Sequence, residues 1–178
     1  MALTATIFNF DIDLSDTDRN VYETLSIRMA QHPSESDEYL VARLLAYLLE
    51  YEEGITFSRG VSEPEEPTIA VRDLTGVIRT WIEIGTPDAT RLHKASKSGA
   101  RVAVYCHKEG AQWLKGLAAA GIHKADALQL FALDRSLIAQ LVSRLDRRMS
   151  FSVSISDREF YISIGNDNLT GTVEPLQI

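Results

Sequence analysis

An acidic residue interrupts the otherwise apolar segment Trp81-Ile82-Glu83-Ile84-Gly85. A segment of this kind is typical of a buried strand, where an unpaired carboxylate is costly. The charge of Glu83 must therefore be balanced by a bound cation or by a basic side chain. If the chain has an active site, we expect that site to be built around Glu83.

The residues before Glu83 predict a hairpin that places a partner opposite it. Two strand patterns, 68–74 and 77–84, are separated only by Thr75-Gly76, which favours a two-residue turn. Side chains of like parity on paired strands share one face of the sheet. In the register that this turn sets, Thr68 lies directly across from Glu83.

Further charged side chains are expected near this hairpin. Glu66 projects from the same face as Glu83, just before the first strand. A helix predicted over 88–98 carries Arg91 and Lys94 along one side. Two interpretations stay open: either cation forms a structural salt bridge with Glu83, or the cluster does chemistry.

A second predicted helix, 35–52, contributes one more acid. Glu38 borders its apolar stripe, whereas Glu35 lies further toward solvent. Glu38 could thus lean toward the sheet. The alternative is that both acids are there because a helix N-terminus favours negative charge.

The elements that must position these residues follow from periodicity and turn signals. The apolar patterns and breakers predict a strand at 5–14, helices at 15–31 and 35–52, strands at 55–60, 68–74 and 77–84, a helix at 88–98, a strand at 102–106, a helix at 109–120, a strand at 127–133, a helix at 135–145, and a terminal hairpin of 151–155 with 159–164 around Asp157-Arg158. This order indicates an α/β fold in which a mixed β-sheet is flanked by helices. We expect a single domain over residues 1–178.

The composition narrows the class of protein. The chain has 178 residues, of which 45% are hydrophobic and 24% charged, as in globular proteins. No apolar run is long enough to cross a membrane, and the single Cys106 agrees with a reducing compartment, so we expect a cytoplasmic protein. The net charge of −7 argues against a passive nucleic-acid coat, although it allows a metal-dependent enzyme acting on phosphates.

Together these residues resemble a known family. The YaeQ family shows similar motifs over essentially the whole chain, namely Met1-Ala2-Leu3, Ala5-Thr6-Ile7, His32-Pro33-Ser34-Glu35 with Glu38, Arg43-Leu44-Leu45-Ala46, Phe57-Ser58-Arg59-Gly60, Glu66-Pro67, Asp73-Leu74-Thr75-Gly76, Trp81-Ile82-Glu83-Ile84-Gly85, Pro87-Asp88, Arg91 and Lys94-Ala95. The family is functionally uncharacterised, and its fold resembles an unusual variant of the PD-(D/E)xK restriction-endonuclease-like superfamily.

That resemblance implies a magnesium site. In the superfamily, acids on the two hairpin strands flank one Mg²⁺, a lysine positions or deprotonates the attacking water, and a helix glutamate often completes the ligand set. Glu83 matches the strand acid, and Glu38, or less closely Glu35, matches the helix glutamate. Gly85 stands where the lysine is expected, so the resemblance points to Lys94 on the following helix.

One position departs from the family pattern. Where the family usually has Glu-Pro-Asp, this chain has Glu66-Pro67-Thr68. A neutral hydroxyl is a poor substitute for a carboxylate beside Mg²⁺. The resemblance therefore implies metal ligands Glu83, Glu38 and Glu66, with a weakened metal site.

Two functions are compatible with these residues. The first is a divalent-metal-dependent nuclease or phosphodiesterase with a degenerate site, in which Glu83, Lys94 and Glu38 are catalytic and nucleic acid is the partner. The second is a noncatalytic domain that keeps the nuclease-like fold to bind a nucleic acid or a protein. Glu83 with Lys94 favours the first, whereas Thr68 and Gly85 favour the second.

Overall fold

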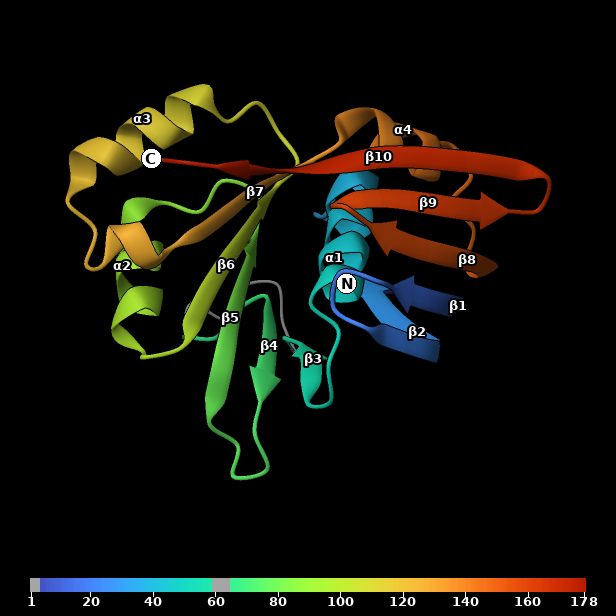
Figure 1. Cartoon of the computed structure of the whole chain (residues 1–178), viewed down its shortest axis with the longest axis horizontal. Helices are drawn as coiled ribbons and strands as arrows, with labels where there is room; N and C mark the ends of the chain where they lie inside the picture. The colour runs from blue at the N-terminus through green and yellow to red at the C-terminus, as the bar shows by residue number, and fades with distance from the viewer. Residues whose placement is uncertain (1–3, 59–64) are drawn as a thin grey trace. The chain divides into compact units, whose positions relative to one another are not determined.

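The computed structural model describes residues 4–58 and 65–178 (Figure 1). Within these residues the strands are hydrogen-bonded in the order β2-β1-β8-β9-β10-β7-β6-β5-β4-β3, with parallel and antiparallel neighbours. Four α-helices and one short 3-10 helix, η1 (Ala125–Ala127), complete the described fold. The predicted α/β class with a mixed sheet is confirmed. No helix in the described ranges has the length and apolar character needed to span a membrane.

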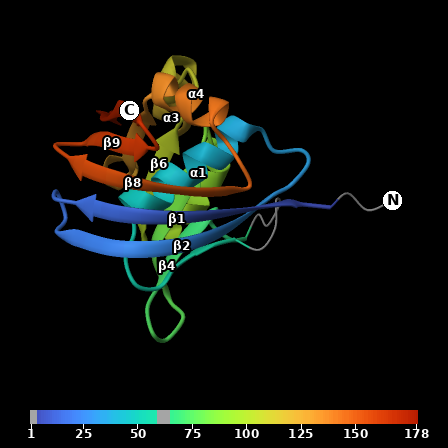
Figure 2. The ribbon, with the colours of Figure 1, turned by 90° about the vertical axis from the view of Figure 1, so that its right-hand side faces the viewer.

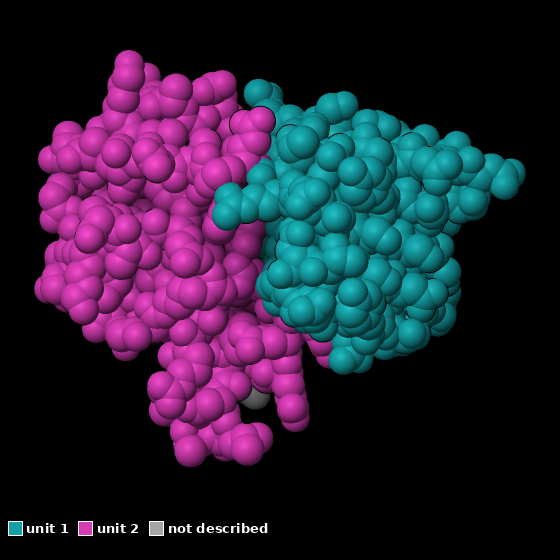
Figure 3. Space-filling view, in the orientation of Figure 1, with its two compact units in different colours: residues 1–49, 133–173 teal, residues 50–132, 174–178 magenta. Residues whose placement is uncertain are grey.

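Two compact units divide the chain (Figure 3). Unit 1 comprises residues 1–49 and 133–173, and unit 2 comprises residues 50–132 and 174–178. Strand β10 contributes residues to both units. The expectation of one domain over residues 1–178 stays a prediction.

Unit 1 is a sheet with two helices. It contains β1 (Thr6–Asp16), β2 (Val21–Gln31), α1 (Asp37–Leu49), α4 (Arg135–Ser143), β8 (Arg148–Ser156), β9 (Glu159–Ile164) and most of β10 (Asp167–Leu176). Along each strand, buried apolar residues such as Phe10, Ile12 and Leu14 alternate with exposed polar ones. This period of two buries one face of the sheet and leaves the other polar.

The helix predicted over residues 15–31 is wrong. Residues Val21–Gln31 form β2, which pairs with β1 in an antiparallel ladder (Figure 2). Leu25 and Met29 are four residues apart, which suits one helical turn but equally two repeats of a strand. Ile27 lies between them and is also buried, so the true period is two.

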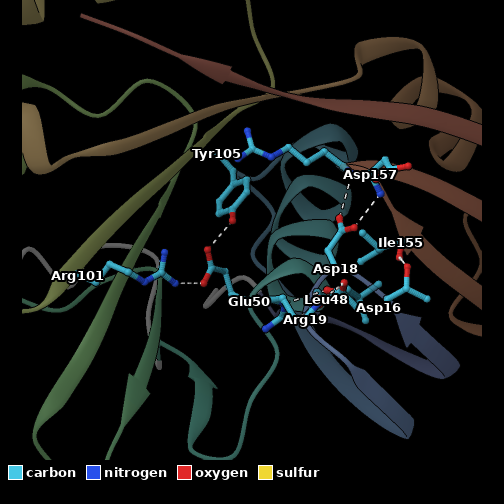
Figure 4. A network of polar contacts seen from close by, with 11 residues as sticks. Asp16, Asp18, Arg19, Leu48, Glu50, Arg101, Tyr105, Ile155 and Asp157 are labelled. Carbon is cyan, nitrogen blue, oxygen red and sulfur yellow. Dashed lines mark hydrogen bonds and ion pairs between the residues drawn. The ribbon is translucent and has the colours of Figure 1, made fainter.

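The turn between β1 and β2 explains why residues 15–18 resemble a helix cap. The Asp18 carboxylate accepts N–H groups of Asp157 and Arg158 in a neighbouring turn, at 2.8 and 3.0 Å (Figure 4). Asp16 pairs with Arg19 at 2.8 Å. These acids therefore stabilise turns and do not begin a helix.

The terminal hairpin is confirmed. Strands β8 and β9 pair across Asp157 and Arg158, whose φ angles of 52° and 58° are those of a tight turn matched to strand twist. Strand β10 follows and was not predicted. Its core-facing position Gly171 carries no apolar side chain, because an added Cβ would meet Leu137 of α4 at 2.7 Å.

Unit 2 holds the remaining elements. They are β3 (Ile55–Phe57), β4 (Ile69–Arg72), β5 (Ile78–Ile84), α2 (Ala89–Lys97), β6 (Arg101–Cys106), α3 (Ala111–Ala120), η1 and β7 (Gln129–Leu133). These match the predicted elements closely. Residues 59–64, which include the end of the predicted strand 55–60 and the first half of the acidic loop 62–67, lie outside the described residues. Helices α2 and α3 cover the sheet face that bears Trp81, where Leu92, Val104 and Leu117 form a buried cluster.

The β4–β5 hairpin has the predicted register but a different turn. Ile69 faces Ile82 and Ala70 faces Trp81, as predicted. However, the backbone N–H of Asp73 bonds to the carbonyl of Val77 at 3.0 Å, which leaves three residues in the loop. An irregularity at Val71/Arg72 offsets the longer loop. The longer loop and this irregularity cancel, so the pairing of Ile69 and Ala70 is the predicted one.

Candidate functional site

Glu83 lies near the end of β5, on the face that α2 and α3 cover. Because side chains two apart on a strand share a face, it lies beside Trp81. Only 3% of Glu83 is exposed, so its charge is almost completely removed from water. Its carboxylate needs strong donors to remain charged there.

Three donors meet this carboxylate. The Trp81 indole N–H donates to Oε1 at 2.7 Å, and the Thr68 hydroxyl donates to Oε2 at 3.2 Å. The Arg91 guanidinium reaches Oε1 at 2.8 Å in an ion pair. Both carboxylate oxygens are therefore engaged by the protein itself. The predicted neighbourhood of Thr68 and Glu83 is confirmed by their hydrogen bond.

Arg91 is held in place from two further directions. Helix α2 begins after Asp88, whose side chain accepts the Arg91 backbone N–H at 2.8 Å. The guanidinium also donates to the backbone carbonyl of Glu66 at 2.8 Å. Arg91 therefore links the segment before β4 to the carboxylate of Glu83. The sequence left Arg91 and Lys94 open as the cation for Glu83, and Arg91 makes the salt bridge.

Lys94 has a different partner. Its ammonium pairs with the Glu65 carboxylate, and both side chains are substantially exposed, at 42% and 75%. An exposed pair of this kind contributes little to stability. The catalytic role implied for Lys94 stays a prediction, and the cation on Glu83 is Arg91.

The acids before and within α1 belong to unit 1. Glu38 is in the first turn of α1 and is exposed. Glu35 pairs with Arg43 at 2.7 Å, and both side chains are 9% exposed. Arg43 also donates to the carbonyl of Ala30 and lies over the Tyr39 ring. Glu35 is thus a structural ion-pair partner, while the ligand role implied for Glu38 stays a prediction.

The donor set around Glu83 does not fit Mg²⁺. Mg²⁺ requires several oxygen ligands, preferably anionic ones. Here Glu83 meets a hydroxyl, an indole N–H and a guanidinium, all of which donate hydrogen bonds to it. Among residues 4–58 and 65–178, no three His, Cys, Asp or Glu side chains gather as a metal-holding group.

Gly85 stands at the position where the superfamily has a lysine. Its φ of +94° lies in the left-handed region, which side-chain-bearing residues rarely adopt. A lysine there would strain the end of β5. The backbone conformation therefore explains why glycine stands at this position.

Glu50, which is buried like Glu83 and Asp16, was not identified from the sequence. The Tyr105 hydroxyl donates to its Oε1 at 2.5 Å, and Arg101 forms an ion pair with its Oε2 (Figure 4). Arg101 also donates to Gln129 at 2.5 Å. Arg101 and Tyr105 are 51 and 55 positions from Glu50, so no local pattern indicates the contact.

The tip of the β4–β5 hairpin presents an apolar side chain to solvent. Leu74 is fully exposed and Val77 is 51% exposed. Asp73 fixes the loop by accepting the Thr75 hydroxyl at 2.6 Å, the Thr75 and Val77 N–H groups, and Arg79 Nε at 2.8 Å. The hydrogen bond from the Thr75 hydroxyl, with smaller contributions from the others, lowers the pKa of Asp73 from 3.8 to about 2.

Fold and site together define a mixed α/β protein in which the buried carboxylate of Glu83 is ion-paired with Arg91. The protein-family model described as "YaeQ protein" matches residues 1–173. The chain belongs to the YaeQ family.

Similar proteins cover nearly the same length. "Uncharacterized protein YaeQ" of Escherichia coli (strain K12) is 33% identical over 171 residues, which is 95% of this chain and 94% of that protein. The crystal structure of YaeQ protein from Xanthomonas axonopodis pv. citri has a TM-score of 0.88 and 34% identity, covering 98% of this chain and 99% of that chain. The crystal structure of YaeQ protein from Pseudomonas syringae has the same TM-score at 27% identity, covering 98% and 97%.

Proposed function

We propose that this chain is a noncatalytic protein-binding domain that keeps a nuclease-like arrangement in unit 2. The observation that carries the proposal is the closure of the Glu83 carboxylate by Trp81, Thr68 and Arg91. A metal ligand must have lone pairs available to the ion, and a hydrolytic site must admit water and substrate. A carboxylate that is 3% exposed and bound by three donors serves the fold instead.

The nuclease-like part of the proposal is supported by the order of unit 2. An antiparallel hairpin, β4–β5, is followed by two parallel strands, β6 and β7, with α2 and α3 on one face. In this proposal Thr68 and Glu83 correspond to the two hairpin positions where the PD-(D/E)xK superfamily has acids. In this proposal Arg91 supplies, as part of the protein, the positive charge that a metal supplies in an active nuclease.

The charge and the hairpin tip favour a protein as the partner. The net charge of −7 opposes binding to phosphate backbones. Leu74 and Val77 expose apolar surface on a loop that Asp73 fixes in one conformation. A preorganised loop loses little conformational entropy when it binds, which increases affinity. An apolar pocket on a partner protein fits this tip.

Calorimetric titration with Mg²⁺ and Mn²⁺ tests the noncatalytic part. Wild type, Glu83→Gln and Arg91→Ala are compared, with cleavage of single- and double-stranded DNA and RNA assayed in parallel. The proposal predicts that wild type and Glu83→Gln give the same heat on addition of either metal. It also predicts that neither protein shows metal-dependent cleavage. Saturable binding or cleavage that is lost in Glu83→Gln would contradict it.

A photoreactive residue at position 74 tests the protein-binding part in cells of the source organism. The proposal predicts a discrete crosslinked species that excess unlabelled wild type suppresses and excess Leu74→Asp does not. A control photoreactive residue at exposed Lys115 of α3 should give no such species. Equal suppression by both competitors would show that the tip is not the contact.

The metal-dependent nuclease is the second candidate. The observation that favours it is the contact between Thr68 and Glu83 on the hairpin. The resemblance to the superfamily implies metal ligands at these two positions. This candidate requires Arg91 to leave Glu83 when the ion binds. Under this candidate, Arg91→Ala should strengthen metal binding and Glu83→Gln should abolish it, so the same titration separates the two functions.

A further inference from the structure

Strand β2 is a long, regular edge of the unit 1 sheet. It has 11 residues and pairs with β1 without any break in register, from Thr6 opposite Gln31 to Asp16 opposite Val21 (Figure 2). Among the strands described, β1 is its hydrogen-bonded neighbour, and β2 ends the strand order. The strand at the other end of that order, β3, has only three residues. Proteins commonly blunt an edge by shortening it, as in β3, because a free edge templates further pairing.

The geometry shows which backbone groups of β2 face outward. The N–H of Asn9 bonds to the carbonyl of Arg147, so the odd-numbered residues of β1 point toward β8 and the even-numbered ones toward β2. The even-numbered residues of β1 pair with odd-numbered residues of β2. The even-numbered residues of β2 therefore direct their N–H and C=O groups away from β1. The carbonyl of Ala30 agrees, since it accepts Arg43 of α1.

The stretch from Tyr22 to Arg28 has neither a proline nor a bulge, and its charged residues are Glu23 and Arg28. Beyond it, the carbonyl of Ala30 accepts a hydrogen bond from Arg43. The residues with outward backbone groups are Tyr22, Thr24, Ser26 and Arg28, and all four side chains are exposed. Proteins commonly protect a free edge with proline, a bulge or several charged side chains, and at the four outward positions this edge carries a single charge, that of Arg28.

We propose that this edge binds the β2 edge of a second copy of the chain, in an antiparallel pair about a two-fold axis at Leu25. Paired residues must share a face and must both direct their backbone groups outward, so even-numbered residues pair with even-numbered ones. With Leu25 on the axis, Tyr22 faces Arg28 of the other copy, and Thr24 faces Ser26. The two sheets then join into one across the axis, as isologous interfaces allow.

Side-chain chemistry favours this partner and this register. Each copy contributes one exposed Tyr22 ring and one Arg28 guanidinium to the two-fold pair, so two cation–π contacts form. Moving the axis one residue forward places Tyr22 against Ala30, whose carbonyl is already bound by Arg43. Moving it one residue back places Arg28 against Asn20, which lies in the β1–β2 turn with φ of 58°. Only the Leu25 axis pairs all four outward residues, Tyr22, Thr24, Ser26 and Arg28, with one another.

Sedimentation equilibrium at up to about 100 μM protein, where a specific interface is populated, tests the proposal. The key variant is Ser26→Pro, because Pro removes an outward N–H without removing a bond to β1. Ser26→Ala is the matched control, since it keeps that N–H. The proposal predicts a dimer in wild type and Ser26→Ala, and a monomer in Ser26→Pro with an unchanged circular dichroism spectrum.

Two further variants keep the test decisive if Ser26→Pro does not fold. Tyr22→Glu would face Arg28 of the other copy and should form a tighter dimer than Tyr22→Ala by about 2- to 30-fold, because a dimer contains two such pairs. Tyr22→Arg should weaken it by a similar factor, because like charges are then opposed. A monomeric wild type, or equal dissociation constants for Tyr22→Glu and Tyr22→Arg, would overturn the proposal. These measurements concern unit 1 and are independent of the role of Glu83.

Discussion

The ion pair between Glu83 and Arg91 should respond asymmetrically to removal of either partner. In Arg91→Ala the buried Glu83 carboxylate loses its ion-pair partner and retains only the Trp81 and Thr68 donors. In Glu83→Gln the amide still accepts from Trp81 and donates to Thr68. The guanidinium left behind is 27% exposed and can be solvated by water. Arg91→Ala should therefore be the more destabilising change.

The expected magnitudes follow from burial. Breaking a buried ion pair by removing one partner lowers the free energy of unfolding by about 3–5 kcal/mol. Because Arg91 is partly exposed, we expect a loss of about 3 kcal/mol for Arg91→Ala. Glu83→Gln exchanges one charged hydrogen-bond acceptor for a neutral one at about 1 kcal/mol. For a chain of this size these values correspond to decreases in Tm of about 6–12 °C and about 2–4 °C.

Tryptophan fluorescence during urea denaturation measures this difference locally, because both tryptophans, Trp81 and Trp113, lie in unit 2. Lys94→Ala, on the same helix as Arg91, is the control and should change stability by less than about 1 kcal/mol because its ion pair with Glu65 is exposed. Equal costs for Glu83→Gln and Arg91→Ala, or a larger cost for Glu83→Gln, would refute the view that Arg91 neutralises a buried charge.

Three further outcomes are expected. Thr68→Asp should lower Tm to the same extent in chelator and in Mg²⁺, because it places a second carboxylate opposite that of Glu83 and creates no complete metal site. Thermal melts under both conditions check this, and recovery of Tm in Mg²⁺ would indicate a latent metal site. The hairpin tip should be fully stable above about pH 4 and should loosen as the pH falls toward about 2, since the folded pKa of Asp73 is depressed to about 2 from 3.8; amide exchange at the tip against pH measures it, and Asp73→Asn should abolish the dependence. Gly171→Ala should destabilise unit 1 by about 1–3 kcal/mol because its Cβ would meet Leu137 at 2.7 Å, as chemical denaturation can show.

Local sequence patterns were sufficient for most of unit 2 and for the position of Glu83. The strand and helix signals there are clear. The predicted register placed Glu83 beside Thr68, although it was derived from a two-residue turn and the loop has three residues. They failed at β2, because residues four apart, such as Leu25 and Met29, satisfy both the helical and the strand period. Ile27, buried between them, is the signal that separates the two.

The partners of the charged side chains could not be predicted as well as the strands. Spacing alone left Arg91 and Lys94 open as partners of Glu83, and the resemblance pointed to Lys94. The choice depends on where the segment before β4 lies, since Arg91 also bonds to the Glu66 carbonyl. The contact of Glu50 with Arg101 joins positions 51 residues apart. Such pairs are set by tertiary packing, which no local periodicity encodes.

A crystal structure determined in the presence of Mn²⁺, with anomalous scattering to locate the ion, tests the central claim most directly. The account predicts no anomalous peak within coordination distance of Glu83, with the Arg91 guanidinium still bound to Oε1 of Glu83. A peak on the Glu83 carboxylate, with Arg91 displaced from it, would contradict the account and establish Glu83 as a metal ligand.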